Sequence, residues 1–238
     1  MAEKQKIRNE ISLRLHQSVA QQMGIAILSG VHKPGEHFAG EIEQSAAMGV
    51  SRTAYREAIR ILTAKGLLES KPKAGTHVTP RKRWNLLDPD MLAWMFMGTP
   101  DEQFIRDLFE LRNLLEPAAA KLAAERRTAE QLGVMQAAIA DMRAYGLATT
   151  EGQAADQRFH ATLLAASGNQ ALATLASSVG AAVQWTTNFK QRANRNPRDP
   201  LPEHIAVCDA IKAGNAAQAF GAMETLIDLA FKDMAFAL

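Results

Sequence analysis

Three polar residues interrupt apolar helical stripes in the second half of the chain, and their types suit the binding of a metal ion. Asp156 and His160 are spaced i, i+4, in a row that continues into Leu163 and Leu164, so both side chains are expected on one buried face. His204 lies on a similar apolar stripe further along the chain. One aspartate and two histidines from two helices can hold a divalent ion such as zinc and leave coordination positions open.

A fourth ionic residue, Arg112, lies among Leu108, Leu111 and Leu115 on an earlier stripe. A buried charge is costly unless it is paired or ligated, so these ionic residues together predict a shared polar cavity. Two interpretations without a metal stay open. In one, each inward histidine is an ordinary core residue whose hydrogen bonds are satisfied. In the other, Asp156 and Arg112 form only a buried ion pair.

A polar run in a later helix is a further candidate lining for this cavity. The run comprises Trp185, Thr186, Thr187 and Asn188. Its hydroxyl and amide groups suit a polyol chain, and Trp185 and Thr187 are the members that we expect to contact a ligand. An ordinary helix face with one buried tryptophan explains the run equally well.

Residues 50–62 are the second chemically distinctive stretch. Arg52, Arg56 and Arg60 follow one another at i, i+4, i+8 and form a basic ridge, and Ser51 is suited to cap the helix N-terminus. Another face is apolar and comprises Tyr55, Ala58, Ile59 and Leu62. Such a helix suits a DNA major groove, where its first residues reach base edges and its arginines hold phosphates. For the stretch taken alone, a solvated surface helix is the plain alternative.

The neighbouring segments favour the DNA-binding interpretation. The expected elements are helices over 11–29 and 40–48 and short strands over 67–70 and 77–79. The second helix and residues 50–62 have the order and spacing of a helix-turn-helix. The loop between the strands is a basic wing that can lay Lys71, Lys73 and the backbone near Gly75 and Thr76 against phosphates or a minor groove.

Charge is unevenly distributed along the chain. Residues 1–83 carry 14 lysines and arginines against 7 acidic residues, whereas the remainder carries 13 against 18. A basic first third on an acidic remainder is typical of a nucleic-acid-binding module joined to a separate body. The single cysteine, Cys208, fits a reducing cytoplasm. No stretch has the apolar length of a membrane span or a signal peptide, so a cytoplasmic protein without a membrane partner is expected.

The chain after Pro100 is expected to be helical throughout. The expected spans are 101–126, 129–145, 150–166, 170–193, 202–213 and 216–237. Helices of this length form a bundle that can enclose a pocket. The expected fold class is therefore mainly α, with a winged helix-turn-helix and its small β wing over 1–80 and an all-helical domain over 101–238.

A set of spaced motifs distinguishes the first third of the chain. They are Ile27-Leu28-Ser29-Gly30, Pro34-Gly35, Gly49-Val50-Ser51-Arg52-Thr53, Arg56-Glu57-Ala58-Ile59-Arg60, Gly66-Leu67-Leu68 and Gly75-Thr76. Together they resemble the winged helix-turn-helix of the GntR family of bacterial transcription regulators. The DNA contacts that the resemblance implies are Arg52, Thr53, Arg56, Gly75 and Thr76. Relatives often begin the second helix with a Pro-Ser-Glu-Arg-like sequence, whereas this chain has Ala39-Gly40-Glu41-Ile42, so an operator sequence cannot be transferred.

A second set of motifs lies in the helical part. They are Leu111-Arg112-Asn113-Leu114-Leu115-Glu116-Pro117, Asp156-x-x-Phe159-His160, Ser167-Gly168-Asn169 and Glu203-His204. These resemble the FCD ligand-binding domain of the FadR subfamily, whose members commonly bind a metal through one aspartate and three histidines and use it to hold a carboxylate effector. The resemblance assigns three ligands to Asp156, His160 and His204. The remaining histidine is Leu226 here, which implies a three-ligand site of weaker affinity. In the alternative, the site is metal-free, and Arg112 and the histidines hold the effector directly.

Residues 81–100 are expected to connect the two parts. The basic start, Pro80-Arg81-Lys82-Arg83, is interpreted as a solvated linker, with extra phosphate contact as the alternative. Residues 84–94 are aromatic and apolar, so we expect them to dock the DNA-binding part against the helical part. This block resembles a subgroup of GntR regulators that respond to sugar acids.

These observations predict a DNA-binding regulator that is not an enzyme, a repressor released by a small carboxylate such as an aldonate or a uronate. The expected partners are double-stranded operator DNA, this effector and a second copy of the chain, with recognition helices about 34 Å apart. A metal-dependent enzyme built on Asp156, His160 and His204 is one alternative, although no activated nucleophile accompanies them. A regulator that responds to a fatty-acyl or other organic-acid ligand is another, and an acyl chain would need a more apolar pocket.

Overall fold

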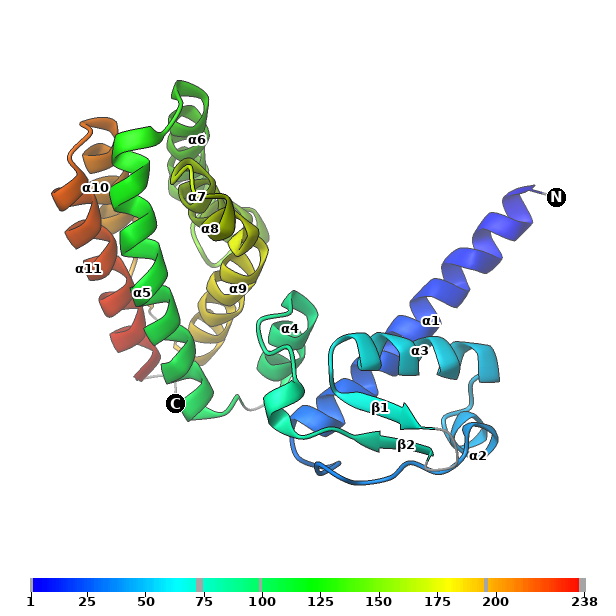
Figure 1. Cartoon of the computed structure of the whole chain (residues 1–238). Helices are drawn as coiled ribbons and strands as arrows, with labels where there is room; N and C mark the ends of the chain where they lie inside the picture. Colours follow the sequence, from blue (N-terminus) through cyan, green and yellow to red (C-terminus); the bar gives the residue numbers. More distant parts are fainter. Residues whose placement is uncertain (1, 72–74, 99, 195–196, 236–238) are drawn as a thin grey trace. The chain divides into compact units, whose positions relative to one another are not determined.

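The computed structural model divides the chain into two compact units, the head (Met1–Thr99) and the body (Pro100–Leu238), both drawn in Figure 1. It describes residues 2–71, 75–98, 100–194 and 197–235, with side chains from residue 15 to residue 234 within these ranges. The architecture is mainly helical with one two-stranded antiparallel sheet, so the expected fold class is confirmed. None of the described helices combines the length and the hydropathy that a bilayer crossing requires.

The head contains a helix-turn-helix followed by a two-stranded wing. Its elements are α1 (Ala2–Leu28), α2 (Glu41–Ala47), α3 (Arg52–Ala64), β1 (Leu68–Lys71), β2 (Gly75–Val78), η1 (Arg81–Arg83) and α4 (Pro89–Met97). The strands run antiparallel, with Leu68 opposite Val78 and Lys71 opposite Gly75. α1 begins earlier than the helix predicted from residue 11. Lys73, at the tip of the wing, lies outside the described residues.

α3 is fixed at both ends by local chemistry. Ser51 caps its first turn, where the side-chain oxygen accepts a hydrogen bond from the Ala54 amide at 3.2 Å. The buried face of the helix comprises Tyr55, Ala58 and Leu62, as the sequence predicts. Gly66 turns the chain toward β1 with a φ of 79°. A Cβ at this position would lie 2.1 Å from the Arg83 carbonyl oxygen, so only glycine fits.

The aromatic segment after the wing belongs to the core of the head itself. Trp84, Met91 and Trp94 are buried in one cluster with residues of α1 and α3, and Trp84 Nε1 donates a hydrogen bond to the Thr79 carbonyl oxygen at 3.1 Å. The head unit therefore extends to Thr99, beyond the expected boundary at residue 80. A unit as small as the head has few apolar side chains, and these complete its core.

The body is a bundle of helices. Its described helices are α5 (Glu102–Arg126), α6 (Ala129–Tyr145), α7 (Thr150–Ala166), α8 (Gln170–Thr174), α9 (Ala176–Ala193), α10 (Leu201–Lys212) and α11 (Ala216–Ala235). α5 packs along α11, and α7 packs against α5, α6 and α9. α10 packs against α5, α6 and α11. Helices from distant parts of the sequence therefore surround one interior.

The structure divides one helix that the sequence predicts as continuous over 170–193. Leu175 interrupts it and donates its amide hydrogen bond to Leu172, three residues back, at 3.0 Å. The Thr174 hydroxyl donates to the Ala171 carbonyl oxygen at 2.7 Å. A hydroxyl that bonds to its own helix backbone competes with the regular hydrogen-bond ladder and favours a bend.

Candidate metal and effector site

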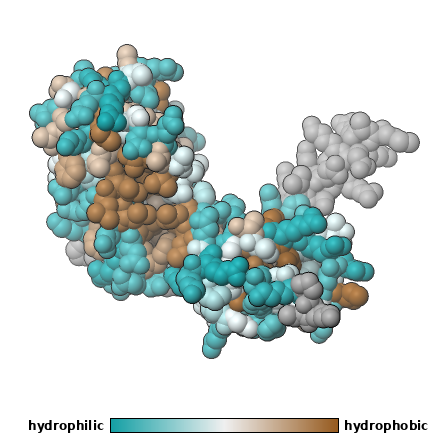
Figure 2. Space-filling view, viewed as in Figure 1, coloured by the Kyte–Doolittle hydropathy of each residue, from teal (hydrophilic) through white to brown (hydrophobic). Residues whose placement is uncertain are grey.

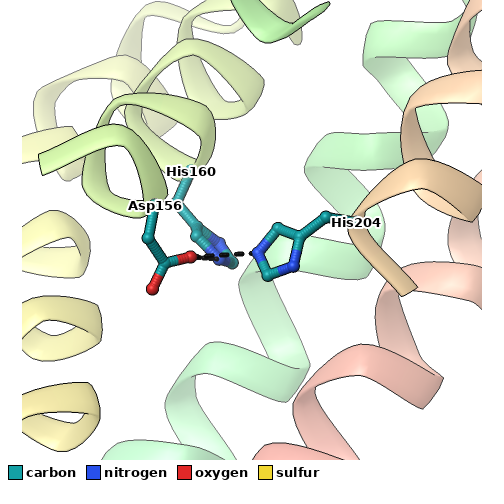
Figure 3. Close-up of side chains that lie close together, drawn as sticks. All are labelled: Asp156, His160 and His204. Atoms are coloured by element: carbon teal, nitrogen blue, oxygen red, sulfur yellow. Dashed lines mark ion pairs between the residues drawn. The ribbon is translucent and has the colours of Figure 1, made fainter. Parts of the chain in front are cut away.

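Asp156, His160 and His204 meet in the interior of the body, where all three are buried (Figure 3). α7 supplies Asp156 and His160, and α10 supplies His204. His204 Nε2 lies 3.0 Å from Asp156 Oδ1, and His160 Nε2 lies 3.5 Å from the same oxygen. One ligand atom from each residue lies within 4.8 Å of the other two. The structure thus brings together the three residues that the apolar stripes placed on inward faces.

The hydrogen bonds of this cluster leave two buried atoms facing each other. His204 Nδ1 bonds to the Pro200 carbonyl oxygen at 2.8 Å, so in the neutral ring Nδ1 carries the proton and Nε2 keeps a lone pair. Among the described residues, neither His204 Nε2 nor Asp156 Oδ1 has a hydrogen-bond partner. Their separation of 3.0 Å is close, but their alignment does not make a hydrogen bond. The two atoms are compatible in the buried interior only if Nε2 is protonated, which makes an ion pair, or if a metal cation lies beside both.

Glu116 is the member of this network that the sequence interpretation missed. It is fully buried on α5, where Arg112 Nε donates to its Oε1 at 2.6 Å. Its other oxygen bonds to His160 Nδ1. Burial raises the pKa of Glu116, but Arg112 and His160 outweigh burial and lower that pKa to about 2. The signal in the sequence was its position four residues after Arg112, the same spacing that relates Asp156 to His160.

The same contacts set the charge and the orientation of His160. Burial lowers the pKa of this histidine, but Glu116 and Asp156 outweigh it and raise the pKa to about 9. Because Nδ1 is held by Glu116, Nε2 is the nitrogen that faces Asp156 and the shared point. Phe159 lies edge-on to both histidine rings, with ring centroids 5.6 Å from His160 and 5.0 Å from His204. Packing and hydrogen bonds together restrict both rings.

The separations of the two histidine nitrogens from Asp156 Oδ1 match those between ligand atoms around a divalent ion. Two ligand atoms that each lie about 2.1 Å from a zinc ion are roughly 3.0 to 3.4 Å apart for bond angles between 90° and tetrahedral. The separations here are 3.0 and 3.5 Å. Burial raises the pKa of Asp156, but the two histidines hold it far below its usual range, so the carboxylate is ionised. A carboxylate that accepts from the far nitrogen of a ligand histidine, as Glu116 does for His160, is a common companion of such sites.

The cluster opens into a small cavity of about 30 Å³, which has room for a water molecule and must widen to admit a larger ligand. Its polar lining comprises Arg112, Asp156, His160, Thr186, Thr187, Lys190 and His204. Leu226 also lines it, so the position at which the family resemblance implies a fourth ligand faces the cavity but offers no ligand atom. Lys190, only 4% exposed, is a second residue that the sequence interpretation missed. Nothing in the spacing of a lysine near a helix end singles it out.

The polar run on α9 is placed only partly as expected. Thr187 lines the cavity and donates a hydrogen bond to Asp156 Oδ2 at 3.2 Å. Thr186 also lines it, but its hydroxyl donates to the Ala182 carbonyl oxygen at 2.7 Å within its own helix. Trp185 is not among the residues that line this cavity. Adjacent residues point about 100° apart around a helix, so Trp185 cannot share the inward face of both threonines.

The arginine ridge of the head is exposed and paired with acidic residues. Glu41 on α2 bridges two of its members, with Oε1 3.0 Å from Arg52 Nε and Oε2 3.6 Å from Arg56 Nε. Arg60 pairs with Glu57 at 2.7 Å. These are surface ion pairs, which are weak in water and readily exchanged for other partners.

The other expected DNA-contacting residues that the structure describes lie at the start of α3 and in the wing. Ser51 and Thr53 are exposed at the start of α3, although Ser51 already serves as the helix cap. In the wing, Lys71 is exposed and lies 3.2 Å from Glu69, and Gly75 has a φ of 75°. The Thr76 hydroxyl bonds across the strands to Ser70 at 2.8 Å. A groove lined by residues that include Arg56, Arg60 and Thr76 joins the helix to the wing.

Two family models match this chain, one in each unit. The model for bacterial regulatory proteins of the gntR family matches residues 15–78. The model for the FCD domain matches residues 107–229, which include the whole ionic cluster. The first match covers α2, α3 and both strands of the wing, and the second begins within α5.

Full-length relatives agree with both matches. The galactonate operon transcriptional repressor of Escherichia coli (strain K12) is 36% identical over 82% of this chain and 87% of its own length. YieP, an HTH-type transcriptional regulator of the same strain, is 34% identical over 88% and 90%. In fold, the chain is similar to Lar of Listeria monocytogenes, with a TM-score of 0.63, 18% identity and coverage of 92% and 96%. The chain belongs to the GntR family of bacterial regulators, carries an FCD domain, and is a transcriptional regulator and not an enzyme.

Proposed function

We propose that this regulator is a repressor that leaves its operator when a small hydroxy acid, such as an aldonate, binds at a divalent metal ion in the body. The observation that carries the proposal is the buried pair of His204 Nε2 and Asp156 Oδ1, which lie 3.0 Å apart without a hydrogen-bond partner among the described residues. The similarity to a galactonate operon repressor supports the choice of effector class.

In this proposal, Asp156, His160 and His204 would hold the ion, which would displace the proton that His160 carries on Nε2 at neutral pH. Glu116 would keep the remaining proton on Nδ1. A bound divalent ion supplies open coordination positions for a carboxylate. Arg112 uses Nε for Glu116, and its guanidinium lines the cavity beside the ligand atoms, so its remaining N–H groups can hold the same carboxylate. Leu226 leaves the ion with three protein ligands, and the acid then completes its coordination.

A fatty-acyl effector fits this cavity less well. The lining places charged Arg112, Asp156 and Lys190 around the space, and an acyl chain would remove water from these groups without replacing their hydrogen bonds. A polyhydroxylated acid replaces those bonds. The proposed effector is therefore polar along its whole length.

The proposed operator contact uses the exposed side of α3. Arg52 and Thr53 lie at the helix start, where they can reach base edges, while Arg56 and Arg60 follow on the next turns and hold phosphates. Lys71, Gly75 and Thr76 add wing contacts. Arg52→Ala should then weaken binding to the specific operator by about 1–3 kcal/mol and leave binding to random DNA nearly unchanged, whereas Arg56→Ala should weaken both. Equal losses on both DNAs for both variants would contradict these roles.

The proposed homodimer uses an apolar face of α5. Leu114 is 68% exposed, and Leu111, Ala118 and Leu122, which are partly exposed, extend the same helical stripe. Figure 2 shows hydrophobic surface gathered over the middle of α5. An apolar stripe left in water marks an interface, and a two-fold operator requires a second copy of the chain. Leu114→Glu should shift the protein toward the monomer in analytical ultracentrifugation and weaken operator binding.

The experiment that tests the effector proposal is a footprint on the DNA upstream of the gene for this protein, with zinc-loaded protein and with galactonate added stepwise. Protection should be lost as galactonate is added, and Arg112→Ala should retain protection at the same concentrations. Lys121→Ala, an exposed substitution on the same helix, is the matched control and should respond like the unchanged protein. Protection that persists with every aldonate and uronate tested would refute the proposal.

A further inference from the structure

Lys190 lies beside the proposed effector site in an incompletely satisfied environment. It is 4% exposed and lines the cavity. Among the described residues, the one ionic partner of its Nζ is Asp233 on α11, at 3.5 Å. A lysine ammonium has three hydrogens to donate, so this long contact leaves donor capacity on a side chain that lines the cavity. Burial lowers the pKa of Lys190, and Asp233 partly opposes that effect.

The position of Lys190 is one helical turn beyond the metal cluster. It follows Thr187 by three residues, which is about 4.5 Å along the α9 axis. Thr187 itself bonds to Asp156 Oδ2. A ligand whose carboxylate lies at Arg112 and the ion, and whose chain runs along α9, therefore meets Lys190 with a distal part of that chain.

The charges around Lys190 are already balanced. Arg198 lies 3.2 Å from Asp233 and 2.7 Å from Glu203, so this cluster contains two cations and two anions. The other end of the cavity differs once a divalent ion is bound and both histidines are neutral. The two charges of the ion and the one of Arg112 would then exceed the two negative charges of Glu116 and Asp156, which leaves one net positive charge. One effector carboxylate neutralises that net charge. A second carboxylate beside Lys190 would add a buried negative charge to a cluster that is already neutral.

From this charge count we propose that Lys190 is a specificity-determining residue that donates a hydrogen bond to a distal hydroxyl oxygen of the effector. Lys190 thereby selects straight-chain hydroxy monocarboxylates over dicarboxylates and over acids without hydroxyl groups. This inference rests on the proposed effector function. It adds that the effector is charged only at the end that lies at the metal ion, and that Lys190 recognises the uncharged end.

The test compares three six-carbon acids by isothermal titration calorimetry on the zinc-loaded full chain. Galactonate carries one carboxylate and five hydroxyls, galactarate carries a second carboxylate at the far end, and hexanoate carries no hydroxyl. The unchanged protein should bind galactonate more tightly than either of the other two. In Lys190→Met, galactonate affinity should fall about 10- to 100-fold, as expected for the loss of a hydrogen bond to a charged donor, while hexanoate affinity stays the same.

Two further variants separate a specific role from damage to the fold. Lys190→Gln keeps a donor without the charge and should show a smaller loss than Lys190→Met. Lys212→Met removes an exposed lysine on α10 and should leave all three affinities unchanged. Zinc affinity and helical circular dichroism should be the same in every variant, because Asp233 keeps Arg198 as a partner.

The possible failures are distinguishable. Unchanged galactonate affinity in Lys190→Met, or tighter binding of galactarate than of galactonate to the unchanged protein, would overturn the role of Lys190 but leave a carboxylate effector in place. Absence of binding by all three acids to the zinc-loaded unchanged protein would instead overturn the effector proposal itself. A Lys190→Met protein that loses zinc affinity would show that Lys190 supports the metal cluster and would also overturn its assignment to the distal hydroxyl.

Discussion

The head and the body both pair arginine with glutamate, but one set of pairs is in water and the other is not. On the head, the side chains of Arg52 and Arg56 are 63% and 60% exposed and share Glu41. In the body, the side chains of Arg112 and Glu116 are 5% and 0% exposed, and Glu116 also holds His160. Both sets contain the same chemical groups at similar distances, so solvent is what separates them.

This difference determines what each set of pairs can do. An exposed pair contributes about 0–1 kcal/mol, so a DNA phosphate can replace the glutamate at little cost. Removal of one partner from a buried pair costs about 3–5 kcal/mol, because the other charge is left without water. The arginines of the head are therefore available to exchange partners, whereas Arg112 and His160 are held in one arrangement before any ligand arrives.

The largest expected effect comes from removal of the shared carboxylate in the body. Glu116→Gln preserves the shape of the side chain but leaves Arg112 and His160 without their common anion. The free energy of unfolding should fall by about 3–5 kcal/mol in urea unfolding followed by helical circular dichroism. Zinc affinity should also fall about 10- to 100-fold, because His160 loses the contact that orients it.

Glu57→Gln is the matched change on the head, where Glu57 pairs with exposed Arg60. Its effect on the free energy of unfolding should stay within about 0.5 kcal/mol. If Glu116→Gln and Glu57→Gln lowered the free energy of unfolding equally, burial would not set the strength of these ion pairs in this protein.

A substitution at Leu226 should produce a smaller effect, in the opposite direction for metal binding. Leu226 is 2% exposed and lines the cavity beside the ligand atoms. Leu226→His offers a fourth ligand, so zinc affinity should rise at least about tenfold, or 1.4 kcal/mol, in competition with a chelator of known affinity. Without zinc, the variant should be less stable than the unchanged protein, because a buried imidazole has replaced an apolar side chain.

Ile227→His controls for the substitution itself. Ile227 is buried next to Leu226 in sequence but is not among the residues that line the cavity. The Ile227→His variant should lose about as much stability as Leu226→His does without zinc, and its zinc affinity should not rise. An equal gain in both variants would mean that added histidine binds zinc without the Asp156, His160 and His204 cluster.

The sequence predicted those features that depend on periodicity and not those that depend on packing across helices. Asp156 and His160 share a face because of their i, i+4 spacing, and both ends of α6 and α7 follow from their flanking residues. The contacts of Glu116 and Lys190 could not be predicted in this way, since the partners His160 and Asp233 lie on other helices. Residues 84–94 were interpreted as a docking segment because their hydrophobicity requires burial. Hydrophobicity does not indicate which surface buries them, and in the structure Trp84, Met91 and Trp94 lie in the core of the head.

The smallest expected effect is on the head, at the glutamate that the two arginines share. Glu41→Gln leaves Arg52 and Arg56 without their common acidic partner. Affinity for random DNA should rise by up to about fivefold, equivalent to about 1 kcal/mol, because the phosphates no longer compete with Glu41. The specific-to-random affinity ratio should fall, since Arg52 loses the contact that orients it before it reaches the bases. Fluorescence anisotropy on operator and scrambled duplexes, at matched salt, measures both quantities.

Glu43→Gln separates this contact from a simple change in net charge. Glu43 is exposed on the same short helix α2, so its replacement removes the same charge from nearly the same place. It should raise affinity for both duplexes slightly and leave their ratio unchanged. If Glu43→Gln lowered the ratio as much as Glu41→Gln, bulk charge and not the bridge to Arg52 would control discrimination. The exposed pairs of the head would then be solvated surface charges that do not position the recognition helix's arginines.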